Sequence, residues 1–172
     1  MAPPENIGLA TFNDLPDDEA IGVLRTCCAS QTWAAYLVER RPYASIAELH
    51  AAAREALAAM TEGELDKALA AHPRIGAPTN SPLSAREQSA VAGARARTLD
   101  QLAEANRRYE ERFGHVYLVC ATGRTADELL EILHDRLAND PGTERRAVRA
   151  ELEKINRIRI DRLIGRTRTE NS

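Results

Sequence analysis

Three polar residues in this chain of 172 residues are candidates for chemistry. His72 ends a helical pattern and precedes Pro73, which disfavours helical backbone at the residue before it. Glu87 follows a connection of eleven residues, longer than the usual helix–helix connection of about two to eight. Arg159 falls within an apolar helical stripe, where a guanidinium is costly unless it is paired or faces a polar cavity. The three are therefore candidates for one polar pocket.

Each of these residues also has a purely structural interpretation. A histidine in the last turn of a helix complements the helix dipole. Glu87 completes the capping-box pattern that begins at Ser84, where glutamate bonds the backbone. Arg159 could form a buried ion pair or extend its guanidinium to solvent. Asn106, within another apolar stripe, could bond either nearby backbone or a substrate. Spacing alone leaves both interpretations open and names no reaction.

Repeated helix-start signals predict the helices that must position these residues. Ser or Thr stands three residues before Glu at Ser45, Thr61, Ser84 and Thr125, which is the capping-box pattern. Proline, glycine and an Asp-Pro-Gly turn interrupt the pattern between helices. The expected helices, about eight, cover residues 17–29, 31–41, 45–60, 61–71, 84–97, 99–113, 125–138 and 143–165. The sequence thus predicts an all-α single compact domain over residues 1–172, with loose ends at 1–13 and 166–172.

One segment departs from this helical pattern. Residues 115–121 read His-Val-Tyr-Leu-Val-Cys-Ala, a short, β-branched and apolar run typical of a strand. No second strand candidate is visible to pair with it. Buried extended backbone needs partners for its N–H and C=O groups, so neighbouring side chains, water or a ligand must bond them. The alternative is that the run is a capped linker or the start of a buried helix.

Composition favours helix and argues against several classes of partner. Apolar residues make up 44% of the chain, aromatic residues 4% and charged residues 28%, a balance typical of helical proteins rich in Ala and Leu. The formal charge of −3 gives no whole-molecule attraction to nucleic acid or an anionic membrane. No apolar run reaches about 18 residues, the minimum for a membrane span. We expect neither a nucleic acid nor a membrane as partner.

Cysteine and histidine spacing gives no sign of a disulfide framework or a metal site. Two of the three cysteines, Cys27 and Cys28, are adjacent, in a helical pattern where small buried residues are expected. The four histidines form no i, i+4 pair and no CxxC motif occurs, so no metal is expected. The N-terminus lacks the basic and apolar regions of a signal peptide. These features predict a cytoplasmic location.

Several motifs, in order along the chain, resemble the family of 2-oxo-4-hydroxy-4-carboxy-5-ureidoimidazoline (OHCU) decarboxylase. The quoted matches are His72-Pro-Arg-Ile-Gly76, Ser84-Ala-Arg-Glu-Gln88, Asn106-Arg-Arg-Tyr109 with Phe113-Gly114, Tyr117-Leu-Val-Cys-Ala-Thr-Gly123, Asn139-Asp-Pro141 and Glu153-Lys-Ile155 with Arg159. They extend from about residue 12 to 164. Each motif alone is weak, but their order and spacing together are specific.

The resemblance implies an all-helical OHCU decarboxylase-like fold, no cofactor, a homodimer and a small-molecule substrate, OHCU. It implies a cofactor-independent decarboxylation that yields (S)-allantoin in urate catabolism. His72 and Glu87 match the family's catalytic residues. The matching substrate contacts are Pro73, Ser84, Gln88, the segment Leu118, Val119, Cys120 and Ala121, and Arg159. Two departures are the His-Val-Tyr run at 115–117, where relatives commonly carry Phe and Pro, and Ser-Ala-Val after Gln88.

The C-terminal helix supports an alternative of a different class. Residues 144–168 contain nine Lys or Arg against four Asp or Glu, a local basic bias. Such a helix could serve a nucleic-acid-binding protein or a helical interaction module without enzymatic activity. Arg159 lies with the apolar stripe and no aromatic residue interleaves the basic ones, so the enzyme interpretation is preferred.

Overall fold

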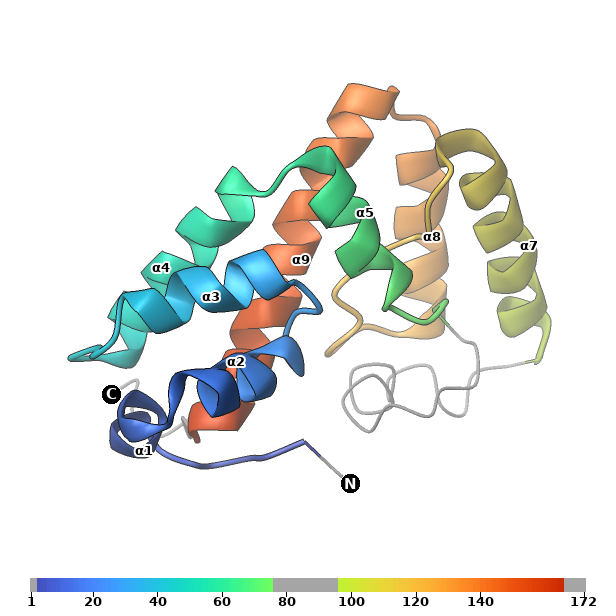
Figure 1. Cartoon of the computed structure of the whole chain (residues 1–172). Helices are drawn as coiled ribbons and strands as arrows, with labels where there is room; N and C mark the ends of the chain where they lie inside the picture. Colours follow the sequence, from blue (N-terminus) through green and yellow to red (C-terminus); the bar gives the residue numbers. More distant parts are fainter. Residues whose placement is uncertain (1–2, 76–95, 166–172) are drawn as a thin grey trace. The chain divides into compact units, whose positions relative to one another are not determined.

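The computed structural model describes residues 3–75 and 96–165, and within these two ranges the regular structure is entirely helical (Figure 1). Its helices are α1 Leu9–Asp14, α2 Asp17–Arg25, α3 Gln31–Glu39, α4 Ile46–Ala59, α5 Glu62–Ala70, α7 Ala96–Phe113, α8 Ala126–Leu137 and α9 Pro141–Ile164. No strand occurs in the described ranges. The predicted all-α class is confirmed.

The predicted helices agree with the observed ones to within a few residues, with two informative differences. The helix expected at 17–29 ends at Arg25, where the last turn tightens: the N–H groups of Thr26 and Cys27 donate to the carbonyls three residues earlier, those of Val23 and Leu24. The last helix begins at Pro141 rather than 143, since proline is well suited to the first helical position. The expected helix at 84–97 lies almost wholly outside the described residues.

Capping residues fix the helix starts where the sequence placed them. At Thr125 the capping box is complete: Glu128 N–H donates to Thr125 Oγ1 at 3.2 Å, and Thr125 N–H donates to the Glu128 carboxylate at 3.1 Å. Thr61 and Glu64 exchange the same two bonds before α5. Ser45 accepts from Glu48 N–H, but that carboxylate bonds the N–H of Ala44 instead. The fourth box, at Ser84, lies outside the described residues.

Residues 1–13 were expected to be loose, and this expectation is wrong for residues 6–13. Helix α1 forms there, with Phe12 fully buried. The backbone N–H groups of residues 6, 7 and 8 donate to the carbonyls of residues 162, 163 and 164 at 3.0, 2.9 and 3.2 Å. The last carbonyls of a helix have no donors within that helix, so this segment satisfies the end of α9. Gly165, at φ +93°, terminates α9 with an N–H bond to the carbonyl of Asp161.

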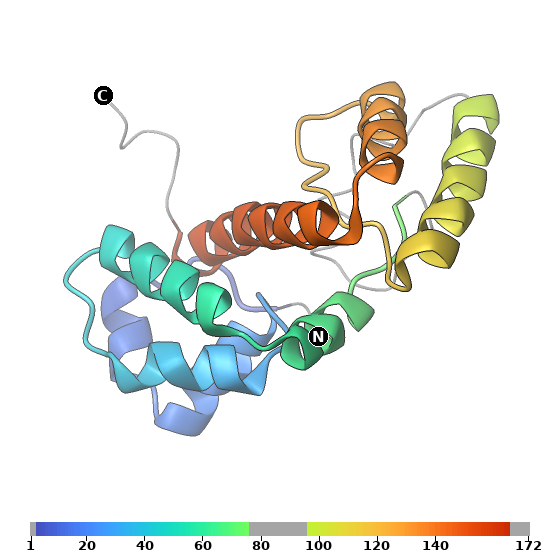
Figure 2. The same cartoon turned by 90° about the horizontal axis from the view of Figure 1, so that it is seen from above.

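The chain divides into two compact units. The first unit comprises Met1–Ala68 and Glu153–Ser172, and the second comprises Leu69–Leu152. In the first unit α3 packs against both α2 and α4, and in the second α7 packs against α8 (Figures 1 and 2). Because the chain divides into two units, the expected single domain stays a prediction.

Candidate functional site

The predicted helix end at His72 is present in the second unit. Helix α5 ends at Ala70, and the N–H of His72 closes one last turn on the carbonyl of Leu69 at 3.0 Å. His72 and Pro73 are both half-buried, so the imidazole stands at the boundary between protein and solvent. A side chain in this position can exchange protons with a bound molecule while its backbone stays anchored.

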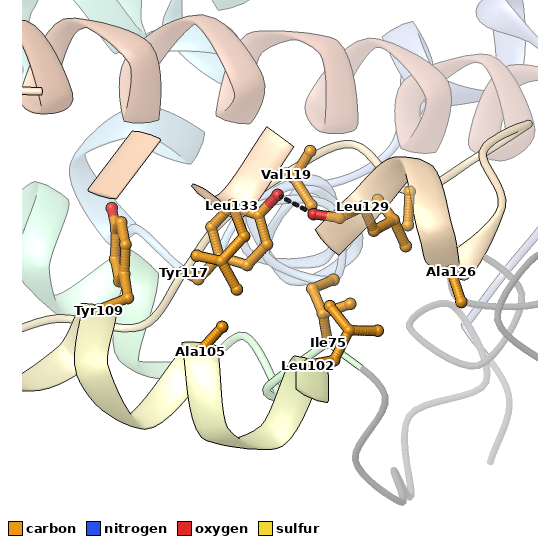
Figure 3. Close-up of a cluster of buried hydrophobic side chains, with 10 residues drawn as sticks. Ile75, Leu102, Ala105, Tyr109, Tyr117, Val119, Ala126, Leu129 and Leu133 are labelled. Carbon is orange, nitrogen blue, oxygen red and sulfur yellow. Dashed lines mark hydrogen bonds between the residues drawn. The ribbon is translucent and has the colours of Figure 1, made fainter. Parts of the chain in front are cut away.

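Ile75 brings the His72 segment together with part of the expected substrate-contact segment. It is buried in one hydrophobic cluster with Val119 and Ala121 (Figure 3). Leu102 and Ala105 of α7 belong to the same cluster. The structure therefore places these two stretches of sequence, each implied to contact substrate, on one shared core.

The strand-like run forms neither a strand nor a helix in the structure. Side chains bond its backbone instead: the carbonyl of Leu118 accepts from Arg136 Nη1, and the N–H of Cys120 donates to Glu151 Oε2 at 3.0 Å. This confirms one of the expected solutions, bonding by neighbouring side chains. Tyr117, where the His-Val-Tyr run ends, is 1% exposed and donates its hydroxyl to the carbonyl of Leu129 at 3.1 Å (Figure 3).

Arg136, which donates to the carbonyl of Leu118, forms a buried ion pair with Glu144. Glu144 is fully buried and accepts from Arg136 Nε at 2.8 Å, from the Tyr109 hydroxyl at 2.5 Å and from Asn139 Nδ2 at 3.1 Å. Burial acts to lower the pKa of Arg136, but the hydrogen bond and charge of Glu144 outweigh it and raise that pKa. Burial and then the bond to Glu144 raise the pKa of Tyr109. Arg136 therefore stays charged and Tyr109 stays a donor.

Sequence reasoning missed both members of this pair, although a signal was available. Arg136 follows Leu129 and Leu133 on the buried stripe of α8, and Glu144 precedes Val148 by one turn on the buried stripe of α9. The same anomaly, a charged residue within an apolar stripe, had singled out Arg159. Applied to every helix, it would have identified Arg136 and Glu144 as well.

Arg159 is buried in the first unit, as its place in the apolar stripe predicted. Its side chain is not extended to solvent: the residue is 8% exposed, and Nη1 donates to the carbonyl of Cys27 at 2.9 Å. That carbonyl lies just beyond the C-terminus of α2, where a cation is favourable. Among the expected site residues, Arg159 belongs to the first unit, whereas His72, Pro73 and residues 118–121 belong to the second.

Of the two alternatives for Asn106, a bond to backbone or to a substrate, the structure shows the bond to backbone. Its Nδ2 donates to the carbonyl of Ile75 at 3.4 Å, and the residue is 3% exposed. Its Oδ1 has no hydrogen-bond partner within the described part of the chain. Ser84, Glu87 and Gln88 lie outside the described residues, so the pairing of Glu87 with His72 stays a prediction.

The cysteines differ sharply in the reactivity we expect. Cys27 and Cys28 are 1% and 0% exposed, and burial raises the pKa of the Cys28 thiol to about 11, against smaller lowering effects of Asn156 and Arg159. At pH 8 the Cys28 thiol is then almost entirely protonated, and a thiol reacts far more slowly than a thiolate. In the folded protein a disulfide reagent should label the half-exposed Cys120 first, and the two buried thiols should react much more slowly. Equally fast labelling of Cys28 in a Cys120→Ser variant would contradict this.

The described residues offer neither a metal-binding cluster nor a membrane-spanning helix. In residues 3–75 and 96–165 no three His, Cys, Asp or Glu side chains come together in a way that could hold a metal ion. Over the same residues, none of the helices combines the length and apolar character that crossing a membrane requires.

The helices and the site define the class: an all-helical protein with a candidate proton-transfer histidine at a helix end. The particular family follows from comparison with known proteins. The chain belongs to the OHCU decarboxylase family, whose sequence model matches residues 13–161.

The similarity extends to proteins of known name and structure. The "Uric acid degradation bifunctional protein TTL" of Arabidopsis thaliana is 33% identical over 149 residues, which cover 82% of this chain and 46% of that protein. The OHCU decarboxylase of Amia calva is 27% identical over 131 residues, 72% of this chain and 75% of that protein. A crystal structure of OHCU decarboxylase in the presence of (S)-allantoin superposes with a TM-score of 0.75 at 28% identity, covering 88% of this chain and all of that one. This chain spans less than half the length of the bifunctional plant relative.

Proposed function

We propose that this chain decarboxylates OHCU to (S)-allantoin, a step in urate breakdown. Membership of the family over residues 13–161 is the observation that carries the proposal. Similarity to an OHCU decarboxylase structure obtained in the presence of (S)-allantoin supports it. So does the position of His72, half-buried on a segment that shares a core with residues of the 118–121 run.

The chemistry of the substrate explains why such an enzyme needs no cofactor. The carboxylate of OHCU is attached one carbon away from a ring C=N bond. When the bond to the carboxylate breaks, its electron pair moves toward that C=N bond, as in a β-keto acid, and carbon dioxide leaves. The substrate thus supplies the electron sink that a cofactor supplies elsewhere. The protein has to place the substrate, move protons and choose one face.

His72 takes the role of proton carrier in this proposal. It handles the proton of the substrate hydroxyl and supports protonation of the ring carbon on one face, which gives a single enantiomer. Glu87 orients the imidazole and raises its basicity. Pro73, Ser84, Gln88 and backbone groups of residues 118–121 hold the ureido and ring atoms.

Arg159 is assigned an orienting role. A tight grip on the departing carboxylate would stabilise the ground state and oppose the reaction. A guanidinium that already donates to the carbonyl of Cys27 suits a weaker task, contact with a carbonyl or hydroxyl oxygen of the substrate. The proposal further includes a homodimer, a cytoplasmic location and no nucleic-acid partner.

The nucleic-acid-binding or interaction-module alternative finds less support. It relied on the basic C-terminal helix, yet Arg159 of that helix is 8% exposed and cannot meet a phosphate backbone without unpacking. Binding to duplex DNA that weakens with salt at physiological ionic strength would revive this alternative.

Circular dichroism during urate breakdown tests the proposal directly. Urate oxidase and hydroxyisourate hydrolase generate OHCU in the cuvette, because the compound is short-lived. Adding this protein should speed the growth of the (S)-allantoin signal, whereas the reaction without it should drift slowly to racemic product. A trace that is the same with and without the protein would reject the proposed activity.

A further inference from the structure

Two contacts, one helical turn apart on α7, hold the segment from His72 to Ile75. Glu110 accepts two hydrogen bonds from the Arg74 guanidinium, Nε to Oε1 at 2.6 Å and Nη2 to Oε2 at 2.9 Å. One turn earlier, Asn106 Nδ2 donates to the carbonyl of Ile75 at 3.4 Å. Residues four apart in a helix share a face, so α7 contacts two consecutive residues of the segment at once.

The remaining freedom of the segment is small. The N–H of His72 is bonded to the carbonyl of Leu69, and the ring of Pro73 fixes its own φ near −65°. Ile75 is 8% exposed, within the cluster that includes Leu102 and Tyr109 of α7 (Figure 3). The segment from His72 to Ile75 is thus anchored at its start by the bond to Leu69, and the two α7 contacts hold its last two residues.

The ion pair contributes geometry rather than stability. The Arg74 side chain is 64% exposed and that of Glu110 26% exposed, and ion pairs in contact with solvent stabilise a fold little. A two-bond contact between a planar guanidinium and a carboxylate nevertheless fixes direction as well as distance. Loss of this pair should therefore leave the protein folded, while the segment from His72 to Ile75 becomes less restrained.

We propose that Glu110 and Asn106 are positioning residues for His72, acting through Arg74 and Ile75. The inference rests on the proposed function, in which His72 carries the proton. Displacing a reacting group by about 1 Å costs on the order of a hundredfold in rate. Neither α7 residue has to touch the substrate for its loss to lower turnover.

The first test compares kcat and KM of Glu110→Gln, Arg74→Gln and the double variant. We expect kcat to fall about tenfold or more in each single variant, with KM within about twofold, because orientation acts on the chemical step. The double variant should lose no more than either single variant, since all three break the same pair. Glu111→Gln is the matched control: it removes an exposed α7 carboxylate 2.5 Å from Arg107, away from the loop. Its kcat should be unchanged.

Thermal unfolding separates positioning from stability. Glu110→Gln and Glu111→Gln should have the same midpoint, because each removes one solvent-contacting ion pair. Equal kcat values for these two variants, or losses that add in the double variant, would overturn the positioning role.

A second measurement does not depend on activity. The NMR order parameter of the His72 amide should fall in Glu110→Gln and stay unchanged in Glu111→Gln. If the wild-type protein fails to accelerate (S)-allantoin formation, the proposed function fails while this difference still supports the loop restraint. Equal order parameters in the two variants would reject the restraint whatever the activity.

Discussion

Replacing Glu144 with glutamine should lower the free energy of unfolding by about 3–5 kcal/mol, the usual cost of removing one partner of a buried ion pair. Glu144 is 0% exposed and is the acceptor shared by Arg136, Tyr109 and Asn139. The amide that replaces it keeps the shape but not the charge. Arg136, 7% exposed, is then left as an uncompensated cation in the core.

The effect should reach the proposed site as well as the core. Arg136 also donates to the carbonyl of Leu118. If its guanidinium becomes disordered, that carbonyl in the 118–121 segment loses its hydrogen-bond partner. Far-ultraviolet circular dichroism in guanidinium chloride is the suitable probe, because Trp33, the single tryptophan, belongs to the first unit.

Two variants sharpen this measurement. Glu104→Gln removes a carboxylate that pairs with Arg107 on the exposed face of α7, so it should leave the free energy of unfolding nearly unchanged. Replacing Arg136 with methionine and Glu144 with leucine together should cost less than Glu144→Gln alone, because no buried charge is left unpaired. A loss below about 1 kcal/mol for Glu144→Gln would show that the buried pair of Arg136 and Glu144 does not stabilise the fold in this way.

Replacing His72 with asparagine should lower kcat by about 10²- to 10⁴-fold, the usual contribution of a general acid–base residue. Asparagine can still form hydrogen bonds, but unlike histidine it neither gains nor loses a proton near neutral pH. The side chain is half-buried at a helix end, so the free energy of unfolding should change by no more than about 1 kcal/mol. The coupled urate assay gives kcat, and thermal unfolding gives the stability.

His134→Asn is the matched control for His72. It replaces an exposed histidine in the last turn of α8, within the same unit, and should leave kcat unchanged. Full activity of His72→Asn would remove His72 from the mechanism. A His72 variant that fails to fold would instead favour the structural interpretation, in which the histidine only terminates α5.

The helices were predictable because their signals are local. Thr61 and Thr125 bond groups only three residues away, and Pro73 restricts its immediate neighbour. The end of α2 was overestimated because no strong breaker stands between Arg25 and Ser30; the chain turns there on bonds to the carbonyl of Leu24.

The candidate site was predictable in part. The apolar stripe of α9 placed Arg159 inside the protein, and the structure confirms its burial. The stripe could not name the carbonyl of Cys27 as its partner, since that contact joins residues 132 apart in the chain. The docking of residues 6–8 on the end of α9 was missed for the same reason.

By itself, the sequence determined the helical class, most helix boundaries, the burial of Arg159 and the family to which the motifs belong. All of these depend on spacing within a few residues or on the order of motifs. Only the tertiary structure decided how the backbone of the run from Tyr117 to Ala121 is bonded without a strand partner, with Arg136 donating to the carbonyl of Leu118 and Glu151 accepting from the N–H of Cys120. It also decided that α7 contacts Arg74 and Ile75, close to His72 in the chain. Those contacts join residues far apart in the chain, and local periodicity carries no information about which distant groups will meet.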